Sequence, residues 1–189
     1  MNSSTKLFAC ALIAAQLLVA VHGGVFDFTD RWVDSDKAKP FPENAVLGGY
    51  DSEGYENYVG RIIAASSVLP ARVRAETGYA TYNSDSVSNQ ANSYDLLVSN
   101  ETLSYEWVRS FDGFREKNPV SVGTSVTNER VYICRARTDG GLFIGTLYLS
   151  QRACFIRYEN WPMRRLTKYE VLVRKLIPAP SSTFEVQVN

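Results

Sequence analysis

The sequence predicts an all-β protein in which two tandem repeats pack into one sandwich-like or barrel-like body. Short runs rich in Val, Ile, Leu, Tyr and Phe follow one another along the chain, and turn signals separate them. No window of ten or more residues combines a helical period with capping residues. A sequence pattern also recurs after 74 or 75 residues, which indicates an internal duplication.

The N-terminal segment is the first element. Lys6 precedes an apolar run over 7–21 that only Gln16 interrupts, and small residues follow it. The run is shorter than the roughly 20 apolar residues that a membrane-spanning helix needs. We therefore expect residues 1–23 to be a secretory signal peptide, with a retained anchor as the alternative, and the mature protein to be secreted into the extracellular space.

Signal removal changes the chemistry that the chain can perform. It takes away His22, which is the only histidine of the protein. Triads with a catalytic histidine and histidine-bound metals are then excluded, and a glycosidase that uses carboxylates alone is the remaining enzymatic alternative. No catalytic motif is present, so we expect no enzyme, no cofactor and no metal site. A formal net charge of +0 argues against nucleic acid or an anionic membrane as the main partner.

The first repeat unit spans 30–99 and the second 104–174, and a tail over 175–189 follows. We expect strands in the first unit at 56–63, 68–75, 79–82 and 93–99. In the second unit and the tail we expect them at 105–110, 130–136, 142–149, 153–159, 168–176 and 183–189. Turn signals include Gly48-Gly49, the Asp51 to Gly54 segment and Asp112-Gly113.

The duplication rests on ordered matches between the units. Y-V-G-R at 58–61 recurs as Y-I-C-R at 132–135, and Y-D-L-L-V at 94–98 recurs as Y-E-V-L-V at 169–173. Trp32 and Trp107 open the two units. Because one unit of this size buries little core, we expect the two to pack about a pseudo-twofold axis. We interpret the tryptophans as packing anchors, and the repeated Arg61 and Arg135 as partners of salt bridges or carbonyl groups.

Three further residues could be modified if the protein is exported. Cys134 and Cys154 lie in strand-like segments twenty residues apart, where either a disulfide or two buried free thiols fits the pattern. Asn100 opens the sequon Asn-Glu-Thr, so it is a candidate for N-glycosylation.

The first unit resembles the DM9 repeat. The motifs that carry the resemblance are P-E-N-A-V-L-G-G-Y-D at 42–51, Y-V-G-R at 58–61, L-P-A-R-V at 69–73 and Y-D-L-L-V at 94–98. The second unit matches less closely, and the resemblance extends over 30–174. It implies two intertwined all-β repeats and a relationship to mannose-binding lectins of invertebrate innate immunity.

The resemblance also implies a sugar site. The family's ligand aspartate corresponds to Asp51, and its ligand lysine corresponds to Arg72, which keeps the charge but changes the shape. Gly49 and Tyr50 lie in the same turn, where a backbone and an aromatic ring could meet the sugar. In the second unit the corresponding residues are Ser125 and Thr146, so we expect one site for each chain.

Two functions of different kinds remain from the sequence. The first is a secreted, non-catalytic lectin-like protein that binds mannose-type glycans or cell-surface glycoproteins, with a homodimer left open. The second is an extracellular structural or protein-interaction module whose sugar site has decayed. On the second view Asp51 is only a surface turn residue and Arg72 a solvated strand residue.

Overall fold

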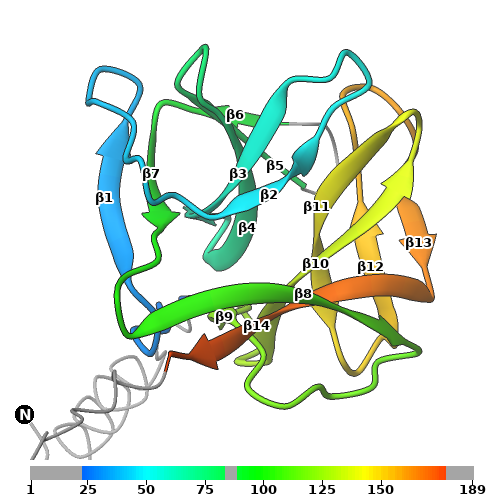
Figure 1. The fold of residues 1–189 in the computed structure, drawn as a ribbon. Helices are drawn as coiled ribbons and strands as arrows, with labels where there is room; N and C mark the ends of the chain where they lie inside the picture. Colours follow the sequence, from blue (N-terminus) through cyan, green and yellow to red (C-terminus); the bar gives the residue numbers. More distant parts are fainter. Residues whose placement is uncertain (1–22, 84–88, 178–189) are drawn as a thin grey trace, which may run out of the picture.

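A computed structural model describes residues 23–83 and 89–177, and it shows an all-β body with strands only (Figure 1). The predicted signal peptide, apart from Gly23, and the predicted strand at 183–189 lie outside these residues and stay predictions. No helix that could cross a bilayer occurs in the part of the chain that is described.

Within residues 23–83 and 89–177, each half of the molecule contains seven strands. The first half contains β1 (Trp32–Asp36), β2 (Leu47–Tyr50), β3 (Glu56–Ala64), β4 (Ser67–Arg74), β5 (Tyr79–Tyr82), β6 (Asn89–Ala91) and β7 (Ser93–Leu97). The second half contains β8 (Leu103–Phe111), β9 (Ser121–Thr124), β10 (Arg130–Thr138), β11 (Gly141–Tyr148), β12 (Ala153–Ile156), β13 (Arg164–Leu166) and β14 (Lys168–Leu176). All of these strands pair antiparallel within one sheet.

The strand pairings of the first half recur in the second. The pairs β1–β7, β2–β3, β3–β4, β3–β7, β4–β5 and β5–β6 correspond to β8–β14, β9–β10, β10–β11, β10–β14, β11–β12 and β12–β13. The register agrees as well, because Trp32 lies opposite Leu97 and Trp107 lies opposite Leu172. The pairing pattern thus shows the pseudo-twofold arrangement, while the exact unit boundaries stay a prediction.

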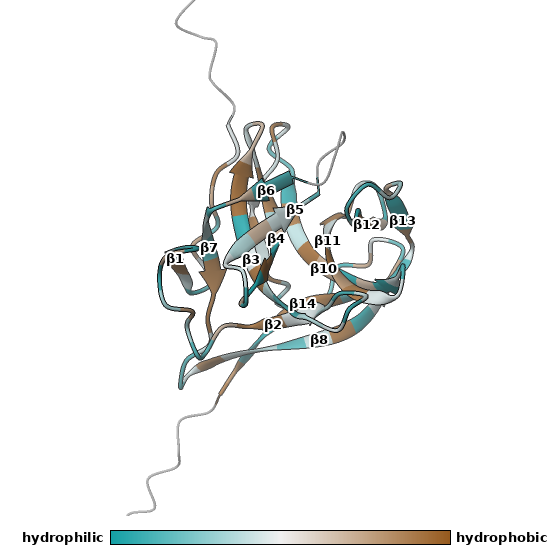
Figure 2. Cartoon of the chain, turned by 90° about the horizontal axis from the view of Figure 1, so that it is seen from above, coloured by the Kyte–Doolittle hydropathy of each residue, from teal (hydrophilic) through white to brown (hydrophobic). Residues whose placement is uncertain are grey.

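The two halves are intertwined rather than merely adjacent. Strand β2 of the first half pairs with β11 of the second through Tyr50 and Leu142, and β9 of the second half contacts β4 of the first. One core cluster takes Val59, Val68 and Leu97 from the first half and packs them against residues of the second. Its second-half members are Val120, Val122, Val131, Ile133, Ile144 and Leu172. Hydrophobic colour lies along strands such as β7, whereas the short β13 and many connecting loops are hydrophilic (Figure 2).

The repeated arginines cross between the halves, which confirms their predicted structural role. Arg61 pairs with Asp95 at 2.8 Å and donates to the carbonyl of Val122 on β9. Arg135 pairs with Glu170 at 2.6 Å and donates to the carbonyl of Gly48 on β2. Each arginine therefore ties its own half to the equivalent strand of the other half.

The tryptophans serve as anchors beside these arginines. The guanidinium of Arg61 lies 4.4 Å from the ring of Trp32, and that of Arg135 lies 4.3 Å from the ring of Trp107. The indole of Trp107 also donates to the carbonyl of Leu47, which belongs to the other half. This geometry agrees with the interpretation of both residues as packing anchors.

Cys134 and Cys154 form a disulfide inside the core of the second half. Strands β10 and β12 carry them on either side of β11, and both residues are completely buried. Of the two alternatives left by the sequence, the structure has the bonded pair.

Several short strands were missed from the sequence, and one turn prediction was wrong. Gly48 and Gly49 signalled a turn, but they lie inside β2. A side chain at Gly49 would meet the carbonyl oxygen of Leu142 at 2.0 Å, so the glycines permit close strand pairing rather than a reversal. Strands β1, β6, β9 and β13 lack the apolar runs that mark a strand in the sequence.

Candidate functional site

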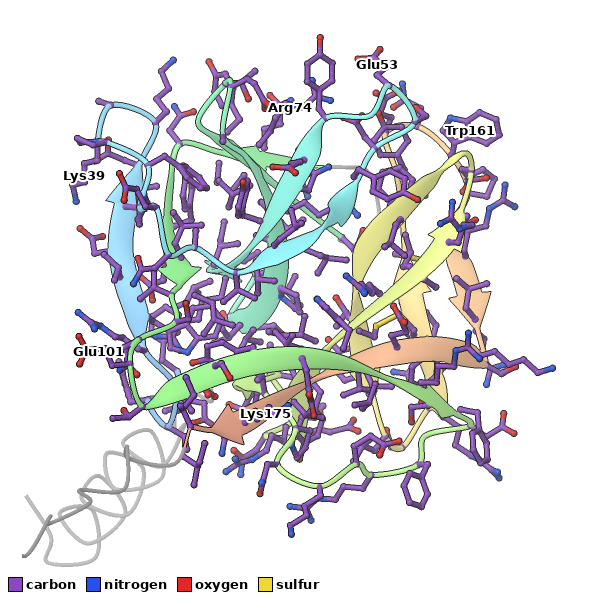
Figure 3. All side chains as sticks on the ribbon, in the orientation of Figure 1. Lys39, Glu53, Arg74, Glu101, Trp161 and Lys175 are labelled. Carbon is purple, nitrogen blue, oxygen red and sulfur yellow. A yellow bond between two sulfur atoms is a disulfide. The ribbon has the colours of Figure 1, made fainter. Side chains whose placement is uncertain are left out.

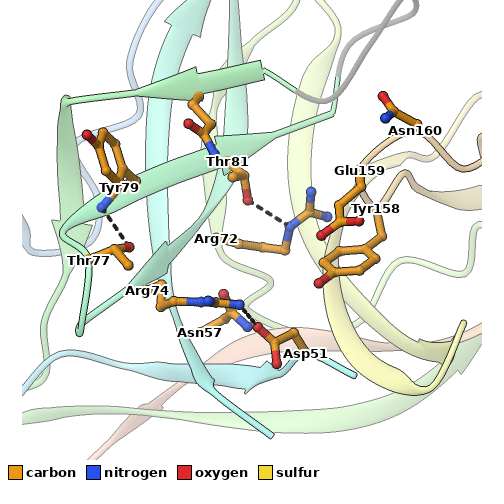
Figure 4. Close-up of a pocket in the computed structure, with 11 residues that line it drawn as sticks. Asp51, Asn57, Arg72, Arg74, Thr77, Tyr79, Thr81, Tyr158, Glu159 and Asn160 are labelled. Atoms are coloured by element: carbon orange, nitrogen blue, oxygen red, sulfur yellow. Dashed lines mark hydrogen bonds and ion pairs between the residues drawn. The ribbon is translucent and has the colours of Figure 1, made fainter. Parts of the chain in front are cut away.

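A cavity of about 360 Å³ opens between the first-half sheet and a loop of the second half (Figure 4). This volume lies within the range of small-molecule sites. The lining residues are mostly polar: Asp51, Asn57, Arg72, Arg74, Thr77, Tyr79, Thr81, Gln90, Tyr158, Glu159 and Asn160.

Side chains from one face of strands β4 and β5 form one wall of this cavity. Arg72 and Arg74 are two residues apart on β4, so their side chains leave the same face of the sheet. Strand β5 contributes Thr81, which lies opposite Arg72 in the strand register. The facing wall is the segment 158–160, which follows β12 of the other half. The site therefore exists only when both halves are packed together.

Asp51 closes the turn after β2 at the floor of the cavity. Its Oδ1 accepts hydrogen bonds from the backbone N–H groups of Glu53 and Tyr55, each at 3.0 Å. Its Oδ2 forms an ion pair with Arg74. Asp51 is only 2% exposed, so the prediction of a surface turn residue is wrong. The residue is a turn anchor and a cavity residue at the same time.

Arg72 is buried between the two halves and bonds to both. The alternative prediction of a solvated strand residue is therefore wrong. Its guanidinium donates to Thr81 and Asn83 of the first half. It also donates to the carbonyls of Ile144 and Arg157 of the second half, at 2.8–3.2 Å. No ion pair with a described carboxylate accompanies it, and burial lowers its pKa to about 10.

Arg72 remains a cation at neutral pH, and it keeps some hydrogen-bonding capacity. A guanidinium has five N–H donors. The four bonds to protein acceptors leave one N–H on the Nη2 atom. That nitrogen belongs to a residue that lines the cavity, so a ligand oxygen could accept from it.

The charges of the described lining residues balance. Asp51 and Glu159 supply the acidic groups, and Arg72 and Arg74 supply the basic groups. Burial raises the pKa of the Tyr158 hydroxyl, so this group stays protonated at neutral pH and able to donate. Such a lining suits a neutral ligand with many hydroxyl groups, and the Tyr79 and Tyr158 rings add apolar surface.

Two predicted ligand residues lie elsewhere. Gly49 packs against the backbone of β11, and the ring of Tyr50 lies 5.6 Å from the guanidinium of Arg137. Neither residue lines the cavity.

Asn100 lies in the connection between β7 and β8, where its Oδ1 accepts from the backbone N–H groups of Thr102 and Leu103. Its glycosylation stays a prediction.

Sequence reasoning also missed part of the site. Arg74 could have been found, because it follows Arg72 by two positions on a predicted strand. The segment 158–160 had no such signal, since it reaches the cavity only through the packing of the two halves. Arg74 and Glu53 lie toward the same end of the molecule as Trp161 (Figure 3).

The pseudo-equivalent position in the second half has a different character. Thr146 lines a cavity of about 600 Å³, and Tyr148 and Phe155 stand there at the positions equivalent to Arg74 and Thr81. Ser125 accepts from the backbone N–H groups of its own turn, as Asp51 does, but it carries no charge. The described residues that line the second cavity therefore include none of the charged groups of the first. Among the described residues, no group of three His, Cys, Asp or Glu could hold a metal ion.

Comparisons with known proteins agree with this fold. The DM9 repeat model matches residues 51–165. The chain is similar to the crystal structure of the nematode sperm cell motility protein MFP2B, with a TM-score of 0.62 and 17% sequence identity. The match covers 83% of this chain and 49% of that one, so this chain spans about half the length of the relative. The comparison with curated proteins finds no match.

Proposed function

The chain belongs to the DM9 repeat family, and from this premise we propose that it is a secreted, non-catalytic carbohydrate-binding protein. The cavity between the halves is its sugar site, and mannose-type glycans are its ligands. Recognition of microbial surfaces in innate immunity is the role that we propose for this binding.

One observation carries the proposal: the cavity combines balanced charges with a dense set of neutral hydrogen-bonding groups. A sugar is neutral, and its neighbouring hydroxyls can donate to a carboxylate while accepting from a guanidinium. Hydrogen bonds to charged groups contribute about 1.5–3 kcal/mol each, roughly twice the neutral value. A few such bonds suffice for a weak and selective site.

The burial of Arg72 supports the same proposal. A buried cation without a carboxylate partner carries a desolvation penalty that neutral acceptors only partly offset. Perturbed ionisable groups in a cavity are frequent at functional sites. A ligand oxygen that accepts from the remaining N–H of Arg72 would form a charge-assisted hydrogen bond with this buried cation.

A second candidate function follows from the ion pair between Asp51 and Arg74. If that pair only holds the turn, the cavity is a vestige, and the molecule is an extracellular protein-interaction module. A glycan array separates the two functions, since a module of this kind would bind none of the immobilised sugars.

Glu159 offers the cleanest test of the cavity. Its side chain is exposed, so Glu159→Gln should leave the fold intact while it removes a charge from the lining. We expect mannose affinity to fall about tenfold or more, because one charge-assisted hydrogen bond is lost. Titration calorimetry measures this change.

Glu53→Gln is the matched control. Glu53 is also exposed and lies in the turn of Asp51, but it does not line the cavity. It should bind mannose as the parent does. Equal affinity in the parent and both variants would place the sugar outside this cavity.

A further inference from the structure

A second group of charged side chains lies on three adjacent strands, β8, β14 and β10 (Figure 1). The strand register places Arg109 opposite Glu170, and Glu170 opposite Arg135. Phe111 lies opposite Lys168 in the neighbouring row. Residues two apart on a strand share a face, so these side chains project from one side of the sheet.

These residues line a hollow of about 850 Å³, together with Arg137, which is two positions beyond Arg135 on β10. Of the described residues that line the hollow, Glu170 alone is acidic, and it is already paired with Arg135. Arg109, Arg137 and Lys168 are exposed and form no ion pair with the described residues. Three positive charges therefore remain uncompensated around one depression.

The pseudo-equivalent surface of the first half has the opposite character. The positions that correspond to Arg109 and Phe111 carry Asp34 and Asp36 on β1, and Lys39 pairs with both. The basic surface is thus a property of the second half alone. The formal net charge of +0 for the whole chain gives no sign of this basic surface, because acidic residues elsewhere offset it.

We propose that this basic hollow binds acidic glycans through their sulfate or carboxylate groups. An arginine guanidinium matches such planar or multidentate anions with paired N–H donors, and Arg109 and Arg137 provide two of them. Phe111, which is 58% exposed, offers its ring to the apolar face of a sugar between the anionic groups.

The shape favours a glycan over an anionic membrane. The cations line a depression on a rigid sheet, which a chain of sugar rings can enter but a lipid surface cannot follow. The proposal does not depend on mannose binding in the first cavity, because the two sites share no residue.

Arg109→Gln/Lys168→Gln in the full-length mature protein tests this site. The probes are a heparin-derived hexasaccharide, an oligogalacturonate, neutral dextran, and phosphatidylcholine vesicles with and without phosphatidylserine. We expect the wild type to bind at least one of the two acidic oligosaccharides and neither dextran nor vesicles. The double variant should bind at least tenfold more weakly. Binding by the wild type should also weaken as the salt concentration is raised from about 0.05 to about 0.5 M, because salt screens the attraction between exposed charges.

Arg115→Gln/Lys117→Gln is the control with the same change of charge. Both residues are exposed, and neither lines the hollow. The control should keep wild-type affinity within about twofold, with unchanged melting temperatures in both variants. An equal loss in both variants, no binding of either acidic oligosaccharide, or binding to phosphatidylserine vesicles alone would overturn the proposal.

Discussion

Arg61→Met should lower the free energy of unfolding by about 3–5 kcal/mol, the usual effect of breaking a buried ion pair. The side chain of Arg61 is 1% exposed and pairs with Asp95, while its Nη1 also donates to carbonyls of Asp27 and Val122. Methionine fills the volume but leaves these acceptors without their donor. Urea denaturation of the purified protein measures the difference.

Arg130→Met is the matched control for this change. Arg130 pairs with Asp27, but its side chain is 57% exposed, and pairs of that kind contribute at most about 1 kcal/mol. We expect a loss of that size or less. If both variants unfold at the same urea concentration, the crossing arginine does not hold the halves together.

Gly49→Ala should destabilise the protein by about 3 kcal/mol or more, because it introduces an atom where none fits. The added Cβ would lie 2.0 Å from the carbonyl oxygen of Leu142, and backbone cannot move away as a side chain can. Relief requires separation of β2 from β11, which is the pairing that joins the two halves. Thermal unfolding of the variant measures the loss.

Gly54→Ala separates this steric effect from the conformational freedom of glycine. Gly54 has a φ of +92°, but no atom lies within 4 Å of its hypothetical Cβ. Its substitution should therefore cost only about 1–2 kcal/mol, the penalty for a side chain on a left-handed backbone. A Gly49 variant as stable as the Gly54 variant would show that the β2–β11 contact is adjustable.

The long strands were predictable because hydrophobic alternation and β-branched residues dominate them. The segment 168–176 was predicted with the bounds that β14 has, and β3, β4, β10 and β11 differ from prediction by at most two residues at an end. Strands such as β2 and β9 were not predictable. Their short sequences, LGGY and SVGT, carry no apolar alternation, and they become strands by pairing with β3 and β10 of their own halves. Contacts with β11 and β4 of the other half add to this pairing.

The site was predictable only in part, for the same reason. Asp51 and Arg72 were identified from the motif, and the structure brings both to one cavity. Their burial was not foreseen, since it arises from the segment 158–160 and strand β11 of the other half. Gly49 and Tyr50 are neighbours of Asp51 in the sequence, but strand pairing turns them away from the cavity.

Titration of mannose into the wild-type protein tests the central proposal most directly. The charged cavity of the first half and the uncharged cavity of the second predict one weak site for each chain. The heat should be unchanged in the presence of a chelator, because the described residues offer no cluster of acidic ligands. Two sites for each chain, or no heat at any concentration of mannose or related glycans, would contradict the proposal of a single sugar site between the halves.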